Sequence, residues 1–143
     1  MVNLGRRHSV DRADLGQLTA VLEAQDADLV CAWLFGSTAR GEARADSDLD
    51  VGVLFETDPP QTLAGLHLDL ADALTEAAER PVDLVVLNRA PVDLIHRVLR
   101  DGILLLERNR SARVRFEVRA RNDYFDLLPH LLRYRRLTRE TSG

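Results

Sequence analysis

Two carboxylates stand two residues apart at the start of an apolar run. Asp48 and Asp50 enclose Leu49, and the run continues to Phe55. In an extended strand, residues two apart share a face and lie about 6.6–6.8 Å apart, so both side chains can reach a pair of cations about 3.5–4 Å apart. Two like charges placed together are costly, and a bound cation compensates them. Carboxylate and water ligands favour Mg²⁺, with Mn²⁺ as the other fit.

A glycine–serine pair and a third carboxylate extend this pattern. Gly36 and Ser37 follow the apolar run 29–35, and ten residues separate them from Asp48. Glycine lets the backbone approach a phosphate, while serine offers a hydroxyl and an amide, so the pair fits a triphosphate cradle. Asp83 stands at the start of a later apolar run. A carboxylate there is costly unless it faces a polar cleft, which makes Asp83 the third candidate.

The same residues also fit plainer roles. Asp48 and Asp50 could form an ordinary solvated strand start, because aspartate pairs are common. Ser47 and Arg40 flank the motif. Ser47 fits either a nucleotide contact or a strand-end hydrogen bond, and Arg40 fits either a phosphate contact or a salt bridge. The combined spacing of Gly36, the aspartate pair and the third carboxylate favours the catalytic interpretation.

The composition excludes several enzyme classes. All 19 basic residues are arginine, so no lysine is available for a Schiff base or for a Walker A phosphate loop, and no glycine-rich dinucleotide motif follows a strand. The segment 108–139 has ten Arg against three acidic residues, a net charge of +7; with −4 for the whole chain, the rest has −11. An acidic body argues against general nucleic-acid binding and suits a site for divalent cations.

The 143 residues predict one domain over 1–143, with a core at about 10–107 and a helical tail at about 108–141. No uninterrupted apolar stretch is long enough to span a membrane, so we expect a soluble, cytoplasmic protein. Cys31 and Trp33 are expected in the core. The four histidines show no metal-ligand spacing, and those at 67 and 96 are expected to be structural.

Apolar periodicity predicts a helix through 15–22, and a turn or short helix over 38–43. The remaining expected elements are strands at 29–35, 48–55, 82–87 and 103–106, and helices at 63–77, 91–100 and 114–132, the last with a kink at Pro129. The predicted fold class is α/β (α+β), a compact sheet with helices packed on it.

These motifs resemble a known family. Gly36-Ser37, ten residues, Asp48-x-Asp50 and then Asp83 in VDLVVL look like the minimal nucleotidyltransferase branch of the DNA polymerase β superfamily, and LFGSTARGEARADSDLDVGVLF resembles it closely. The resemblance covers about 10–107 and implies a small mixed sheet flanked by helices. The length and the arginine-rich last helix, with FEVRARNDYFDLLPHLLRYRRL in the tail, resemble the MntA-type antitoxins of type VII toxin–antitoxin pairs.

The resemblance implies roles for individual residues. Asp48 and Asp50 would hold two Mg²⁺ ions, and Asp83 would complete the second metal site and help to activate the acceptor hydroxyl. Gly36 and Ser37 would contact the triphosphate, and Ser47 is added as a further nucleotide contact.

The resemblance also implies a reaction and a partner. Such antitoxins transfer AMP from ATP to a tyrosine hydroxyl of their cognate HEPN-family ribonuclease toxin, HepT, and silence it within a hetero-oligomeric complex. Two alternatives remain open: a small-molecule nucleotidyltransferase of the aminoglycoside-modifying kind, and an antitoxin that neutralises its partner by binding alone. An enzyme for a small acceptor usually needs a further domain that encloses the acceptor pocket, and after Leu106 this sequence predicts little more than one long helix. This favours a protein acceptor.

Overall fold

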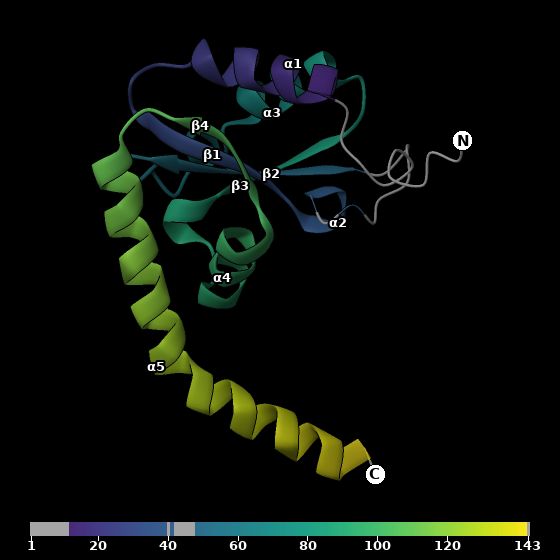
Figure 1. Ribbon diagram of the computed structural model, residues 1–143, viewed down its shortest axis with the longest axis vertical. Helices are drawn as coiled ribbons and strands as arrows, with labels where there is room; N and C mark the ends of the chain where they lie inside the picture. Colours follow the sequence, from purple (N-terminus) through teal and green to yellow (C-terminus); the bar gives the residue numbers. More distant parts are fainter. Residues whose placement is uncertain (1–11, 40, 42–47, 143) are drawn as a thin grey trace.

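The computed structural model (Figure 1) describes residues 12–39, 41 and 48–142. Its strands are β1 (Leu29–Phe35), β2 (Leu49–Phe55), β3 (Val82–Val86) and β4 (Ile103–Glu107). Its α-helices are α1 (Arg12–Glu23), α2 (Gly36–Ala39), α3 (Leu68–Ala78), α4 (Val92–Asp101) and α5 (Arg110–Ser142). Short 3₁₀ turns are η1 (Leu63–Leu66) and η2 (Leu87–Arg89). The other expected helices and strands are present with shifted ends, whereas the turn or short helix expected over 38–43 lies partly outside the described residues.

The strands form one mixed sheet in the order β3-β2-β1-β4. β1 runs antiparallel to both β2 and β4, while β2 and β3 are parallel. The predicted fold class is therefore confirmed. Because of these directions, the carboxyl end of β1 meets the amino ends of β2 and β3. Here the edge of the sheet is formed by the ends of the strands and not by the long side of an outer strand. The Gly-Ser motif follows the end of β1, and the Asp-x-Asp motif stands at the start of β2, so both motifs lie at this edge.

Both faces of the sheet are covered, by different helices. In Figure 1, α1 and α3 lie on one side of the sheet, and α4 and the first part of α5 lie on the other. Leu22 and Leu74 pack with Val51 and Val53 on the first side, whereas Ile95 and Val98 pack with other sheet residues on the second. Strand side chains alternate between the faces, so β1, β2 and β3 contribute to both clusters, whereas β4 contributes to the first alone. This double burial explains why the strands read as nearly continuous apolar runs.

The structure divides the expected helix 63–77 into η1 and α3. His67 lies between them in the left-handed region, with φ of 51°, and its ring stacks on Phe55 at a centroid distance of 4.3 Å. Gly65 lies so close to the backbone carbonyl of Pro60 that an added Cβ would overlap it. This tight turn interrupts the helix. Apolar periodicity does not reveal such a break, because η1 and α3 carry similar residues.

α5 extends beyond the apolar stripe at 114–132 and nearly fills the helical tail expected at about 108–141. It begins at Arg110, where Asn109 Oδ1 accepts a hydrogen bond from the Ala112 N–H at 3.0 Å, as N-cap residues do. Pro129 lies inside the helix, and Figure 1 shows α5 bending in its middle part. A bend in this helix agrees with the expected kink, since proline removes an intrahelical hydrogen bond and crowds the preceding turn. Within the described helices, none is both long and apolar enough to cross a membrane.

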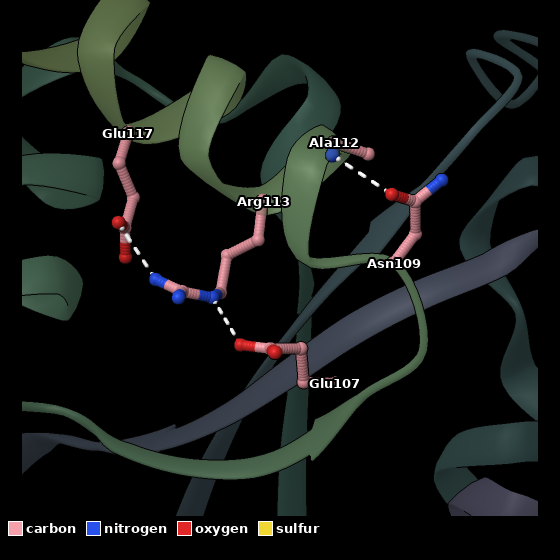
Figure 2. Close-up of polar contacts among 5 residues, drawn as sticks. All are labelled: Glu107, Asn109, Ala112, Arg113 and Glu117. Carbon is pink, nitrogen blue, oxygen red and sulfur yellow. Dashed lines mark hydrogen bonds and ion pairs between the residues drawn. The ribbon is translucent and has the colours of Figure 1, made fainter.

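An arginine bridge fixes the start of α5 on the sheet. Figure 2 shows Arg113 between two carboxylates: Nε donates to Glu107 Oε2 at 2.5 Å, and Nη1 donates to Glu117 Oε2 at 2.8 Å. The Arg113 side chain is only 17% exposed. The sequence analysis did not single out this bridge, although the spacing of Arg113 and Glu117 is that of a helical ion pair.

A second arginine closes the carboxyl end of α1. Arg108 follows β4, and its guanidinium donates to the backbone carbonyls of Glu23 at 2.7 Å and Gln25 at 2.8 Å. It also reaches the carbonyls of Leu22, Asp26 and Leu29. The last carbonyls of a helix have no partner within the helix, and the negative end of its dipole attracts a cation. One side chain therefore joins β4 to the turn that leads into β1.

We expect Arg108→Ala to lower the free energy of unfolding by about 1–2 kcal/mol, because several carbonyls lose a charged donor. Arg108→Lys keeps the charge but not the planar fork, so it should recover only part of the loss. Urea unfolding measures both, with exposed Arg110→Ala as the control. Equal stability of Arg108→Ala and Arg110→Ala would contradict this role.

The single cysteine is expected to be chemically inert in the folded protein. Cys31 is fully buried, and burial raises the pKa of its thiol to about 12. The thiolate, which is the reactive form, is therefore scarce at neutral pH. We expect no reaction of native protein with a disulfide reagent such as DTNB at pH 8, and one thiol per chain after unfolding in guanidinium. Rapid reaction without denaturant would contradict the buried position.

Candidate active site

The sheet brings two of the three predicted carboxylates side by side. Asp50 on β2 pairs in register with Asp83 on the parallel strand β3, and with Phe35 on β1. Residues paired across neighbouring strands point to the same face, and such strands lie about 4.8 Å apart. The burial of Leu49 and Val51 in the α1/α3 core leaves Asp50 on the opposite face, toward α4. Asp83 is on that face too, because its neighbours Val82 and Leu84 pack against the same α1/α3 core.

Asp48 is two residues before Asp50 in the chain. It lies immediately before β2 and is exposed, as Asp83 is, whereas Asp50 is half-buried. The structure thus places the three carboxylates at one edge of the sheet, two of them open to solvent.

Gly36 is in direct contact with the Asp50 carboxylate. It is the first residue after β1, its φ is +80°, and a Cβ built on it would lie 2.2 Å from Asp50 Oδ2. The left-handed backbone favours glycine, and any larger residue would also force the Asp50 carboxylate to move. The motif alone explains Gly36 by the room that a phosphate needs. The structure adds that it makes room for Asp50.

Ser37 follows in α2, a helix of four residues, and is half-buried. It is the next residue after Gly36, and its role as a triphosphate contact stays a prediction. Ser47 and Arg40 lie outside the described residues, so the nucleotide contact assigned to Ser47 stays a prediction.

The donor chemistry suits a hard divalent cation. Carboxylate oxygens are what Mg²⁺ and Mn²⁺ prefer, and Mg²⁺ keeps several waters, which the exposed edge can supply. Within the described ranges, however, no three His, Cys, Asp or Glu side chains are drawn together closely enough to hold a metal ion. The structure therefore brings Asp50 and Asp83 together by register, but it does not gather all three carboxylates into one cluster. Their roles as ligands stay predictions.

Other residues with reactive side chains lie in packing positions. His96 of α4 stacks on Tyr124 of α5, with ring centroids 3.7 Å apart and nearly parallel rings. Trp33 is 4% exposed and contacts Phe116. The structural interpretation of His67, His96 and Trp33 is therefore confirmed.

The contact at Gly36 predicts opposite effects for two glycine-to-alanine changes. Gly36→Ala should lower the free energy of unfolding by about 1–3 kcal/mol, because alanine is strained at positive φ and its methyl group displaces the Asp50 carboxylate. Gly16→Ala should raise stability by up to about 1 kcal/mol, since Gly16 is in α1 with open space around it. Thermal unfolding of both variants checks the signs. A Gly36→Ala protein as stable as wild type would refute the contact.

Solved structures of toxin–antitoxin complexes share this fold. A toxin–antitoxin complex with AMP-PNP superposes with a TM-score of 0.73 at 24% identity, covering 90% of this chain and 98% of that one. An MntA–HepT complex gives 0.69 at 21%, covering 93% and 100%. A complex of tri-AMPylated HEPN toxin with MNT antitoxin from Shewanella oneidensis gives 0.68 at 22%, covering 91% and 97%. At these identities the likeness establishes the fold.

Among curated protein sequences, none matches this chain. The family model for polymerase β nucleotidyltransferases matches residues 17–111, which is more than half of the chain. That range contains the glycine–serine pair and all three carboxylates at the sheet edge. The resemblance drawn from these motifs is confirmed, and the chain belongs to the polymerase β nucleotidyltransferase family.

Proposed function

We propose that this chain is an antitoxin that transfers AMP from ATP to a tyrosine hydroxyl of a HEPN-family ribonuclease toxin and thereby neutralises it. The observation that carries the proposal is the pair Asp50 and Asp83, in register beside Gly36, on a nucleotidyltransferase fold. Nucleotidyl transfer needs negative side chains that can hold cations where a triphosphate and a hydroxyl meet. The edge of this sheet offers such a place.

The proposed reaction joins the acceptor oxygen to the α-phosphorus of ATP and breaks the bond from that phosphorus to the bridging oxygen of pyrophosphate. Pyrophosphate leaves with the bonding electron pair. Asp83 would accept a hydrogen bond from the attacking hydroxyl and take its proton as the new bond forms. Gly36 and Ser37 contact the triphosphate, with Ser47 as the further contact.

Asp48 and Asp50 would hold Mg²⁺, with Asp83 completing a second metal position. Two such ions supply electrostatic stabilisation of the charge on the entering and leaving oxygens. The absence of a side chain at Gly36 leaves the room that the Asp50 carboxylate occupies.

The partner in this proposal rests on the structural relatives. One of them is a toxin–antitoxin complex with AMP-PNP, an ATP analogue, and another is a tri-AMPylated HEPN toxin in complex with its MNT antitoxin. The relatives of this fold thus include complexes that hold an adenine nucleotide and a modified toxin.

The openness of the edge favours a protein acceptor over a small molecule. Asp48 and Asp83 are exposed. The part of α5 beyond Tyr124 also carries large exposed apolar side chains, namely Phe125, Leu132, Tyr134 and Leu137. Such groups mark surfaces that bind other proteins. The same surface would serve an antitoxin that acts by binding alone, so activity must separate the two.

Transfer of label from α-³²P-ATP with Mg²⁺ to a co-purifying or neighbour-encoded protein tests the proposal. We expect wild type to label that protein and Asp48→Asn with Asp50→Asn to reduce the rate at least about a hundredfold, because the cations lose their ligands. Asp69→Asn with Asp72→Asn on α3 changes the charge equally and should leave the rate near wild type.

Two other results would redirect the assignment. If no label moves while the double variant at 48 and 50 still suppresses the partner's toxicity, neutralisation is by binding alone. If label moves equally with both double variants, the carboxylates are not the catalytic groups.

A further inference from the structure

The outer edge of β3 offers backbone groups that no described strand uses. In the described part of the chain, β3 has β2 as its one neighbouring strand. The Leu49 N–H donates to the carbonyl of Pro81 at 2.9 Å, and Leu49 pairs with Val82. The backbone N–H and C=O groups of successive residues point alternately to the two sides of a strand. The backbone groups of Asp83 and Val85 therefore point to β2, whereas those of residues 82, 84 and 86 point outward.

The first outward N–H has a partner, and the next two face the free edge. The Val82 N–H donates to Thr75 Oγ1 of α3 at 3.1 Å. For the N–H groups of Leu84 and Val86, no such acceptor is found among the described residues. Unpaired N–H and C=O groups along a strand form a template for another extended chain.

An open apolar trough runs beside these groups. A cavity of about 630 Å³ is lined by Leu84, Val85 and Val86 of β3 together with Pro59, Pro60 and Thr62 from the segment after β2. Pro59 is buried, and the tight turn at Gly65 holds this segment in place. The trough therefore adds an apolar wall to the row of peptide groups, as a groove for alternate side chains of a bound strand requires.

This edge leads directly to the candidate active site. Asp83 precedes Leu84 on the same strand, on the face that holds Asp50. Because the peptide groups of Asp83 point to β2, an antiparallel strand added outside β3 would place one residue opposite Asp83 as a non-hydrogen-bonded pair. Such pairs have the closer spacing, with Cα atoms about 4.5 Å apart and side chains on the same face. A side chain at that position projects beside both carboxylates.

We propose that the outer edge of β3 binds an extended segment of the protein acceptor by strand addition, and that this docking presents the reacting hydroxyl to Asp50 and Asp83. The proposal rests on the proposed function, because it concerns the acceptor of that same reaction. The occupant follows from the chemistry of the edge. Only an extended polypeptide offers N–H and C=O groups at the spacing of Leu84 and Val86 together with alternate side chains for the trough.

A proline at position 86 tests this docking selectively. Val86 has φ of −84°, close to the value that proline imposes, and its N–H faces outward, so proline removes a donor that the isolated fold does not use. Val86→Ala is the matched control, because it shortens the side chain but keeps the N–H. We expect Val86→Pro to raise KM for the protein acceptor at least about fivefold above that of Val86→Ala, with equal affinity for ATP. Equal KM values in the two variants would overturn the proposal.

Hydrogen exchange on the wild-type complex gives a second test that needs no variant. The amides of Leu84 and Val86 should exchange at least about tenfold more slowly when the acceptor protein is bound, since strand addition gives them acceptors. The amides of Asp83 and Val85 already face β2 and serve as internal controls. Unchanged exchange at 84 and 86 in the complex would overturn docking at this edge.

The two proposals fail in different ways. If wild type labels the acceptor while the proline variant and the exchange rates show no effect, only the docking is wrong. If wild type binds ATP but labels no protein, the proposed function fails, and the docking inference fails with it. Protection of Leu84 and Val86 in the protein alone, increasing with its concentration, would assign this edge to a second copy of the chain.

Discussion

Gly36, the first residue after β1, has a left-handed backbone and lies against the Asp50 carboxylate. The candidate site depends on this contact. The contact locates one carboxylate relative to the backbone of β1, and the register of β2 with β3 then locates Asp83 beside it. Ser37 follows Gly36 in sequence, so the same turn also sets its position. A β-carbon at this turn would separate the strand end from the carboxylate.

The buried faces of the sheet hold this register. Leu49 and Val51 flank Asp50 and are fully buried against α1 and α3. A slip of one residue would turn Asp50 into that apolar core and move both neighbours to the opposite face, so packing strongly disfavours it. Stability and chemistry are therefore coupled: the core that stabilises the sheet also keeps the carboxylates at its edge. The Arg108 and Arg113 bridges reinforce the same arrangement by tying β4 to α1 and to α5.

Much of the fold follows from apolar periodicity, because strands buried on both faces give short apolar runs and helices give stripes. The motif at Gly36, Asp48 and Asp50 likewise predicts the family from the sequence alone. What the sequence could not show depends on long-range contacts: the break at His67, the carbonyls that Arg108 reaches, and the outer edge of β3. The domain limits and the contact of Ser47 stay predictions.

We propose that Asp50 and Asp83 together bind the divalent cations. Electron paramagnetic resonance of Mn²⁺ with a non-hydrolysable ATP analogue measures this most directly, on wild type, Asp50→Asn, Asp83→Asn and the exposed control Asp93→Asn. We expect each change at 50 or 83 to weaken Mn²⁺ binding at least about tenfold, while Asp93→Asn leaves it unchanged. Equal Mn²⁺ affinity in all four proteins would contradict the account.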